Sequence, residues 1–191
     1  MSMTNDTTTP ELTVHVRDLL RTPGGRKHVD LRFKPADLRF KPADLATPVA
    51  TVDEAEQATL VADIDSVVEG LLLQGRITAR VQLSCVRCLT TFGQDVEVEV
   101  TELFALDPAD AEEEGYAVVP VDMLPLDTMI RYALVLALPS TPVCREDCAG
   151  LCPECGADRN TADCGHGGAE PDPRWLPLAG LLKQDGEDTN D

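Results

Sequence analysis

The sequence predicts an α+β fold in which an antiparallel β-sheet meander packs on one buried helix, with a cysteine-rich loop and a C-terminal helix. Three observations support this class. The middle of the 191-residue chain is rich in Val, Leu, Ile and Thr, which favour strands. An apolar segment of helical length, residues 128–138, follows these strands. All seven cysteines lie in closely spaced motifs, six of them in three pairs.

The N-terminal part is expected to begin with a disordered tail and a short strand. Residues 1–10 are polar and Thr-rich, which is typical of disorder. Residues 12–16 alternate between apolar and polar side chains and predict a strand, with His15 on its polar face. A Pro-Gly-Gly sequence at residues 23–25 then predicts a loop.

A tandem repeat follows, in which residues 31–37 recur unchanged as residues 38–44. Its prolines exclude a continuous helix, and two short copies are too few for a solenoid. We interpret the repeat as a duplication tolerated in a surface loop, and its role stays open. The alternative is a basic-aromatic arm that contacts RNA, because four cations flank two phenylalanines. The residues concerned are Arg32, Phe33, Lys34, Arg39, Phe40 and Lys41.

The central segment predicts a meander of three strands. These strands are expected at residues 62–73, 76–85 and 89–104. The Gln74-Gly75 pair indicates a turn between the first two strands. Alternation is strict over residues 94–101, where valines face one side and carboxylates the other, so one face of the sheet should be wet. Cys85 and Cys88 then lie at the turn between the second and third strands.

The rest of the chain predicts an acidic loop, a short strand and two helices. Five carboxylates in residues 107–115 indicate an exposed loop, and residues 116–119 resemble a strand. Asp127 can cap a helix over residues 128–138, which is apolar nearly all round and should be buried. Pro173 can start a second helix. The apolar residues at helical spacing in this second helix are Trp175, Leu178, Ala179 and Leu182.

The chain is expected to be one domain in the cytoplasm. This domain covers residues 11–183 and includes a cysteine-rich region at residues 144–166, before an acidic disordered tail at residues 184–191. The sequence has no stretch of about 18 apolar residues, so no membrane span is expected. The polar N-terminus lacks the basic and apolar regions of a secretory signal, which favours the cytoplasm.

The cysteine spacing predicts structural zinc. Two thiols separated by two residues on a tight turn can reach one tetrahedral ion. Seven cysteines and one histidine give eight ligands, the number that fills two closed four-coordinate sites. The predicted ligands are Cys85, Cys88, Cys144, Cys148, Cys152, Cys155, Cys164 and His166. Zinc, about two ions per chain, is therefore expected to order the cysteine loop.

Two other interpretations of the thiols fit less well. The odd number of cysteines and the lack of an export signal argue against a disulfide framework. A thioredoxin-like Cys-x-x-Cys motif should begin a helix in a βαβ unit, and neither such pair does. A redox- or metal-responsive regulator would need accessible thiols of lowered pKa, whereas a closed zinc site would resist mild oxidant.

The spacing leaves open which thiols share an ion. Cys144, Cys148, Cys152 and Cys155 could form one local site, which would leave the remaining four ligands for a second. Equally, the Cys85/Cys88 pair could face the Cys152/Cys155 pair, as in a zinc ribbon. His166 is the least secure ligand, because it lies among glycines and could instead be exposed to solvent.

The charge distribution is strongly acidic, which most simply keeps the protein soluble; the alternative is that it attracts a basic partner. The net charge is −18, and it is unevenly spread. Residues 1–45 hold eight Lys/Arg and six Asp/Glu, a net charge of +2, whereas residues 46–191 hold eight and twenty-eight, a net charge of −20. A surface this acidic repels phosphates, so direct RNA contact is expected only through residues 17–41. A ribosomal protein is one such basic partner.

The sequence does not predict an enzyme. It contains no Gly-rich phosphate loop, no dinucleotide fingerprint and no nucleophile elbow. Sets of ligands rich in thiolates form closed structural sites, whereas a catalytic zinc keeps one coordination position open. We therefore expect a non-enzymatic protein, with a thiol regulator as the alternative.

The chain resembles the YceD-like family, which is linked to the accumulation of large-subunit ribosomal RNA. Residues 81–89 are similar to the family's central strand and its Cys-x-Arg-Cys-Leu motif. Residues 134–144 resemble its buried helix and the Pro-rich turn after it, and residues 172–175 resemble the start of its C-terminal helix. Residues 148–156 match the cysteine block of actinobacterial-type members. The resemblance implies a factor in large ribosomal subunit assembly, for which we expect a basic ribosomal protein or a pre-large-subunit particle as the partner, and it supplies no catalytic residue.

Overall fold

The structure is a computed structural model, and it describes residues 12–107, 117–118, 122–166 and 174. The chain divides into two compact units, residues 1–146 and 147–191, which are described separately. The predicted tails at residues 1–10 and 184–191, most of the acidic loop and the helix predicted from Pro173 lie outside the described residues. The single domain over residues 11–183 therefore stays a prediction.

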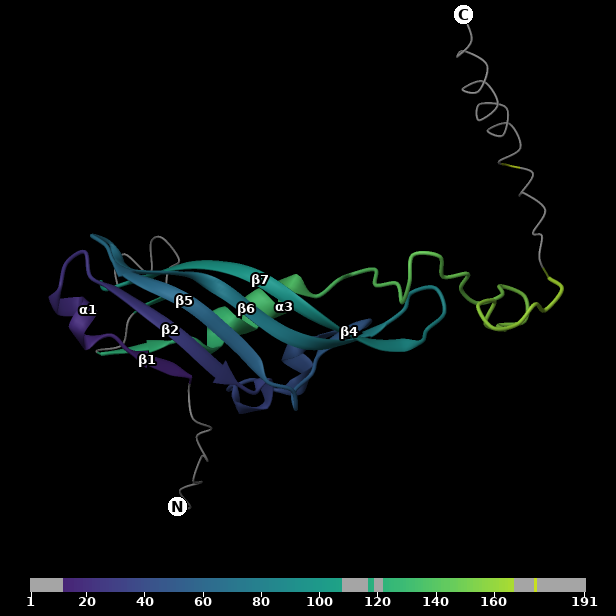
Figure 1. Ribbon diagram of the computed structural model, residues 1–191, viewed down its shortest axis with the longest axis horizontal. Coiled ribbons are helices and arrows are strands. Elements are labelled where there is room, and N and C mark those ends of the chain that lie inside the picture. The colour runs from purple at the N-terminus through teal and green to yellow at the C-terminus, as the bar shows by residue number, and fades with distance from the viewer. Residues whose placement is uncertain (1–11, 108–116, 119–121, 167–173, 175–191) are drawn as a thin grey trace, which may run out of the picture. The chain divides into compact units, whose positions relative to one another are not determined.

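The first unit is built on a seven-stranded sheet (Figure 1). Its strands are β2 (Arg26–Phe33), β3 (Ala46–Thr47), β4 (Ala50–Val52), β5 (Ala58–Ser66), β6 (Gly70–Ser84), β7 (Thr91–Ala105) and β8 (Ala117–Val118). The strand order is β2-β5-β6-β4-β3, and β7 pairs with β6 on the side opposite β5 and β4. Every pair is antiparallel except β7 with β8, so the predicted meander is confirmed.

Two short strands and the helices α1 and α3 are also described in this unit. Strand β1 (Thr13–His15), predicted from the N-terminal alternation, pairs antiparallel with β9 (Met123–Pro125). Helix α1 (Arg17–Arg21) is a single turn that the sequence did not predict. Helix α3 (Asp127–Ala137) confirms the second half of the predicted α+β fold. None of the described helices is long and apolar enough to cross a membrane.

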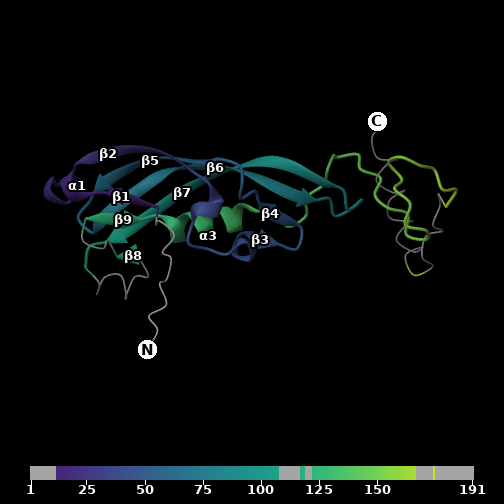
Figure 2. The same ribbon diagram turned by 90° about the horizontal axis from the view of Figure 1, so that it is seen from below.

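The core lies between one face of the sheet and α3 (Figure 2). Period-two alternation turns one set of side chains inward on each long strand, as Val96, Val98 and Val100 show on β7. The largest buried residues include Leu60, Ile64, Leu71, Leu73, Ile77, Leu83, Phe104, Leu124, Ile130 and Leu134. Each contributes roughly 1.5–3 kcal/mol relative to an exposed position. The other face of the sheet is wet, as predicted.

The predicted turn at Gln74-Gly75 is wrong. Both residues lie inside β6, a continuous strand of 15 residues, and the chain reverses between β5 and β6 instead. Glycine is needed at position 75 because two strands approach closely there. An added Cβ would lie 2.4 Å from Ala62 Cβ and 2.5 Å from the Val61 carbonyl oxygen. This glycine therefore marks a close backbone approach, not a reversal of the chain.

The two copies of the tandem repeat adopt different structures, which corrects the interpretation as a surface loop. The first copy ends β2 and buries Phe33 before a 3₁₀ turn at Pro35–Asp37. The second copy buries Leu38 and continues into a 3₁₀ turn at Pro42–Leu45. Its Phe40 lies under the guanidinium of Arg131 of α3, 5.1 Å from the ring centroid. The cations of the repeat are exposed, whereas Phe33 is buried and Phe40 is half-buried.

Helix α3 differs from the prediction in two ways. Asp127 is the first residue of the helix rather than its cap, because Leu126 occupies the capping position. Its carboxylate is buried and accepts a hydrogen bond from the Leu12 backbone N–H at 3.1 Å. The sequence also predicts that this helix is buried, but Tyr132 and Leu136 are 54% and 83% exposed. Among the described residues, the sheet packs on one side of α3 and leaves these two side chains exposed.

Candidate metal centre

The structure brings the eight predicted ligands together in two groups of four. The first group contains Cys85, Cys88, Cys144 and Cys148; the second contains Cys152, Cys155, Cys164 and His166. Within each group the ligand atoms all lie within 4.8 Å of one another, so each group could hold one metal ion. A tetrahedral ion with Zn–S bonds of about 2.3 Å requires thiolates at separations of this order.

The first group begins with a knuckle between β6 and β7. Cys85 follows the end of β6, and its carbonyl oxygen accepts a hydrogen bond from the Leu89 N–H at 2.9 Å. Leu89 adopts a φ of 61°, which tightens the turn and keeps Cys88 next to Cys85. The Val86 N–H donates to the Pro142 carbonyl at 2.9 Å, which brings Cys144 to the knuckle. Cys88 Sγ then lies 3.6 Å from Cys144 Sγ.

Backbone amides prepare the first group for thiolates. Burial alone would raise the pKa of Cys85, but hydrogen bonds from nearby backbone N–H groups outweigh it and lower the pKa to about 6. The donors are the N–H groups of Cys144, Cys88 and Arg87, the last at 3.4 Å from Cys85 Sγ. The hydroxyl of Thr90, 3.3 Å from Cys88 Sγ, lowers the pKa of Cys88. The group is thus suited to binding a cation.

Arg87, which lies inside the first knuckle, has a structural contact. Its Nη1 donates to the Glu146 carbonyl at 3.2 Å. This bond and the Val86–Pro142 bond together hold residues 142–146 beside the β6–β7 turn. The Cys-x-Arg-Cys motif therefore supplies two thiols and a side chain that positions the following segment.

The second group forms a knuckle within the cysteine loop. The Gly156 N–H donates to the Cys152 carbonyl at 2.9 Å, and Gly156 adopts a φ of 73°, a left-handed conformation that favours glycine. Cys152 is buried and Cys164 is half-buried, whereas Cys155 and His166 are exposed. This group is therefore more accessible to solvent than the first.

The thiols of the second group differ in their acidity. Backbone N–H groups of Cys155 and Glu154 lower the pKa of Cys152 to about 6. The His166 N–H favours the thiolate of Cys164, but the neighbouring thiol of Cys152 and burial outweigh it and raise its pKa. A bound cation would favour both thiolates together. The His166 Nε2 lies 3.7 Å from Glu154 Oε2, so this carboxylate lies beside the ring.

Neither grouping considered from the sequence is the one observed. The Cys144/Cys148 pair joins the Cys85/Cys88 knuckle, not the Cys152/Cys155 pair. The Cys152/Cys155 pair instead uses Cys164 and His166, which follow it within the same loop. The length of the segment explains the second group, because residues 156–164 are long enough for the chain to fold back onto the Cys152/Cys155 knuckle.

Sequence reasoning missed two residues that contact the thiols. Thr90 lies beside Cys88, as described above. Asn160 Nδ2 lies 3.5 Å from Cys148 Sγ, and Asn160 Oδ1 accepts from the Ala149 N–H at 2.8 Å. Asn160 also contacts Asp158 Oδ1 at 2.6 Å, which orients the amide. No motif marks such residues, because only the folded loop brings them to the sulfur atoms.

Substitution of His166 tests the second group. His166→Ala is expected to lower the affinity of this group for metal, since a three-thiolate site is incomplete, whereas His166→Cys should retain the metal. Elemental analysis after gel filtration measures the bound metal, with the first group as an internal reference. Unchanged metal content and affinity in His166→Ala would contradict a ligand role for His166.

Comparisons with known proteins agree with the resemblance in the sequence. Residues 73–182 match a family described as "Large ribosomal RNA subunit accumulation protein YceD". An uncharacterized protein of Mycobacterium tuberculosis is 33% identical over 176 residues, which cover 90% of this chain and 81% of the relative. An uncharacterized protein of Mycobacterium leprae is 35% identical over 132 residues, which cover 67% of this chain and 60% of the relative. No solved structure matches. With more than half of its length matched by the family and its cysteine groups assembled, this chain belongs to the YceD family.

Proposed function

We propose that this protein is a non-enzymatic factor that promotes accumulation of large-subunit ribosomal RNA during assembly of the large ribosomal subunit in the cytoplasm. The match to the YceD family carries this proposal. Two groups of four ligands, each able to hold a metal ion, support a structural metal in each.

Zinc is the metal that the donor sets favour. The first group offers four thiolates and the second offers three thiolates and an imidazole, which are common ligand sets of structural zinc. Hydrogen bonds from backbone N–H groups to Cys85 and Cys152 favour the thiolate form that zinc requires. The ions would order the β6–β7 turn and the loop that follows residue 147.

A basic ribosomal protein is the partner we favour, as opposed to RNA. The net charge of −20 over residues 46–191 supports attraction to a basic protein. Burial of Phe33 and the contact of Arg131 with the Phe40 ring argue against an aromatic platform for single-stranded RNA in the repeat. Contact of the exposed cations in residues 17–41 with RNA stays a second route to a pre-large-subunit particle.

A ribosome profile of a deletion strain tests the proposed function. We expect a lower ratio of large to small subunits on a sucrose gradient and less mature large-subunit RNA. Complementation by the wild-type chain should restore both quantities. A normal subunit ratio and normal large-subunit RNA in the deletion strain would refute the proposal.

A further inference from the structure

Strand β7 has an open outer edge in the described part of the chain. It pairs with β6 along its whole length, but β8 pairs only with its last two residues, Phe104 and Ala105. Over residues 91–103, no described strand pairs with the other edge of β7. A long open edge presents backbone N–H and C=O groups that can pair with an added strand.

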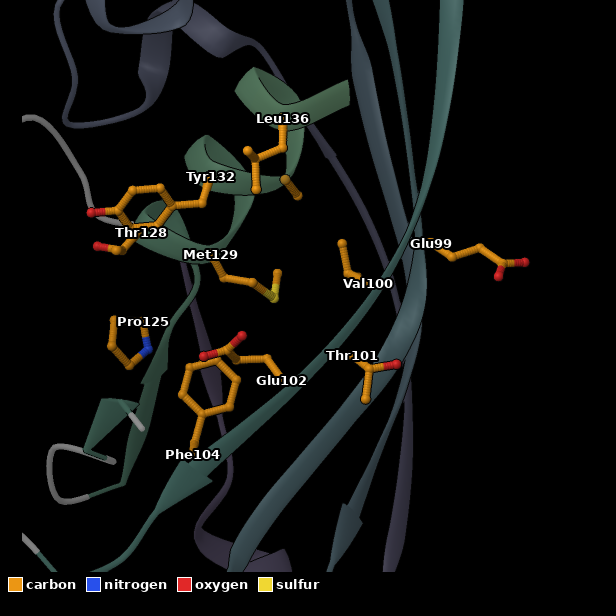
Figure 3. A pocket seen from close by; sticks show the side chains of 11 residues that line it. Glu99, Val100, Thr101, Glu102, Phe104, Pro125, Thr128, Met129, Tyr132 and Leu136 are labelled. Atoms are coloured by element: carbon orange, nitrogen blue, oxygen red, sulfur yellow. The ribbon is translucent and has the colours of Figure 1, made fainter. Parts of the chain in front are cut away.

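An apolar groove lies beside this edge, between β7 and α3 (Figure 3). Its volume is about 470 Å³. Val100 and Phe104 line it from the sheet, and Met129, Ala133 and Leu136 line it from the helix. The exposed side chain of Leu136 forms part of its wall, with Tyr132 next to it. An apolar side chain placed there would cover hydrophobic surface that the described residues leave open.

The groove also contains one carboxylate. Glu102 lies on the inward-facing side of β7, and its side chain extends into the groove (Figure 3). Burial raises the pKa of Glu102. A cationic group at the rim of the groove would compensate for this desolvation, because an opposite charge favours the ionised form.

The opposite face of β7 is acidic. Asp95, Glu97 and Glu99 point to the wet face of the sheet, as Figure 3 shows for Glu99. In the described part of the chain, these three carboxylates form ion pairs with two arginines of β6. The contacts are Arg80–Asp95 at 3.0 Å, Arg76–Glu97 at 3.1 Å and Arg76–Glu99 at 3.3 Å. A strand added to β7 would therefore lie next to a row with excess negative charge.

These features distinguish between two possible occupants of the edge. A second copy of β7 would place Asp95, Glu97 and Glu99 near the same carboxylates of its partner, and like charges on paired strands repel. A strand with alternating cations and apolar residues would satisfy both faces, since successive side chains point to opposite sides. Its cations would face the acidic row, and its apolar residues would face the groove.

We propose that the edge of β7 and the β7–α3 groove bind a β-strand of a basic partner protein, in which Lys or Arg residues alternate with apolar residues. The identification of this partner as a ribosomal protein rests on the proposed function, but strand binding does not. Backbone pairing supplies affinity, while the groove and the acidic row select the sequence of the strand.

A designed peptide tests this proposal on the full-length protein. The probe is a labelled ten-residue peptide of alternating Lys and Val, and binding is measured by fluorescence anisotropy at low and physiological salt. A Glu/Val peptide and a Lys/Val peptide with N-methylated backbone along one edge serve as controls. We expect only the unmodified Lys/Val peptide to bind, and hydrogen exchange to slow in residues 91–103 when it does.

Substitutions at exposed positions locate the site. Leu136→Lys places a cation at the groove and should weaken binding at least roughly tenfold. Glu97→Lys with Glu99→Lys should reverse the preference in favour of the Glu/Val peptide. The matched control, Glu56→Lys with Glu69→Lys, makes the same change in net charge at exposed positions outside the groove and β7 and should alter binding far less.

Several outcomes would overturn the proposal. Equal weakening by the control pair would show attraction to net charge alone, and equal binding of the N-methylated peptide would exclude strand pairing. A single-stranded RNA oligomer could bind where the peptide does not. If Leu136→Lys weakens this RNA binding, the groove is an RNA site and the proposal is wrong. The deletion strain separates this proposal from the proposed function. If the strain lacks large subunits and the Leu136→Lys variant restores them fully, the strand site is refuted and the proposed function stands.

Discussion

Replacing Cys85 with Ser is expected to remove one of the two proposed metal ions and to lower the free energy of unfolding of the sheet by at least about 3 kcal/mol. Cys85 is completely buried at the end of β6, where three backbone N–H groups are directed at its sulfur. A serine hydroxyl is a poor zinc ligand and would leave the remaining thiolates of the group without their cation. Structural zinc contributes ~10–16 kcal/mol in peptides, but this sheet also has its own core.

The Cys155→Ser variant is the matched control for this prediction. Cys155 is exposed and belongs to the second group, so its substitution should also cost one ion but alter unfolding of the sheet much less. Elemental analysis gives the stoichiometry, and urea unfolding monitored by circular dichroism gives the stability. Release of both ions from Cys85→Ser would contradict the observed grouping. Retention of both would exclude Cys85 as a ligand.

Gly75→Val is expected to destabilise the protein by roughly 2–3 kcal/mol or more, because the side chain has no space. A Cβ at this position meets Ala62 Cβ at 2.4 Å and the Val61 backbone carbonyl at 2.5 Å. Neither neighbour can rotate away, since one is a methyl group fixed to the backbone and the other is the backbone itself. Strands β5 and β6 would have to separate where both are paired.

Gly93→Val provides a control on the next strand, β7. Its Cβ would meet the guanidinium of Arg80 at 2.7 Å, and this group lies at the end of a flexible, partly exposed side chain. We expect a change within about 0.5 kcal/mol, because Arg80 can move and valine favours strands. Urea midpoints of the two variants measure the contrast. Similar destabilisation by both substitutions would contradict the close approach at Gly75.

The local features of this protein follow from its sequence. Alternation over residues 94–101 predicts the inward valines of β7, and an apolar run with helical length predicts α3. The spacing of Cys85 and Cys88 predicts the knuckle between β6 and β7. These features are predictable because side-chain direction, helical period and knuckle geometry depend on residues a few positions apart.

Prediction from the sequence fails where the same residue or segment can serve two structural roles. Glycine serves turns and close backbone approaches alike, so Gly75 suggested a turn although it lies inside β6. The two copies of the repeat have identical sequences, yet Phe33 enters the core through β2 and Phe40 packs on Arg131 of α3. Identical local propensities cannot distinguish them, because the difference comes from what each copy contacts.

The sequence alone predicted the central meander, helix α3, the Cys85/Cys88 knuckle and the eight residues that the structure gathers into two groups able to hold metal ions. Only the tertiary structure decided that Cys144 joins Cys88 across 56 positions of the chain, and that Leu136 lines an open groove. Ligand spacing specifies which thiols can share an ion locally, but the path of the chain decides which distant pair completes the site. Likewise, the apolar residues of a helix predict that it packs against a sheet. The extent of the sheet then decides which face of the helix remains exposed.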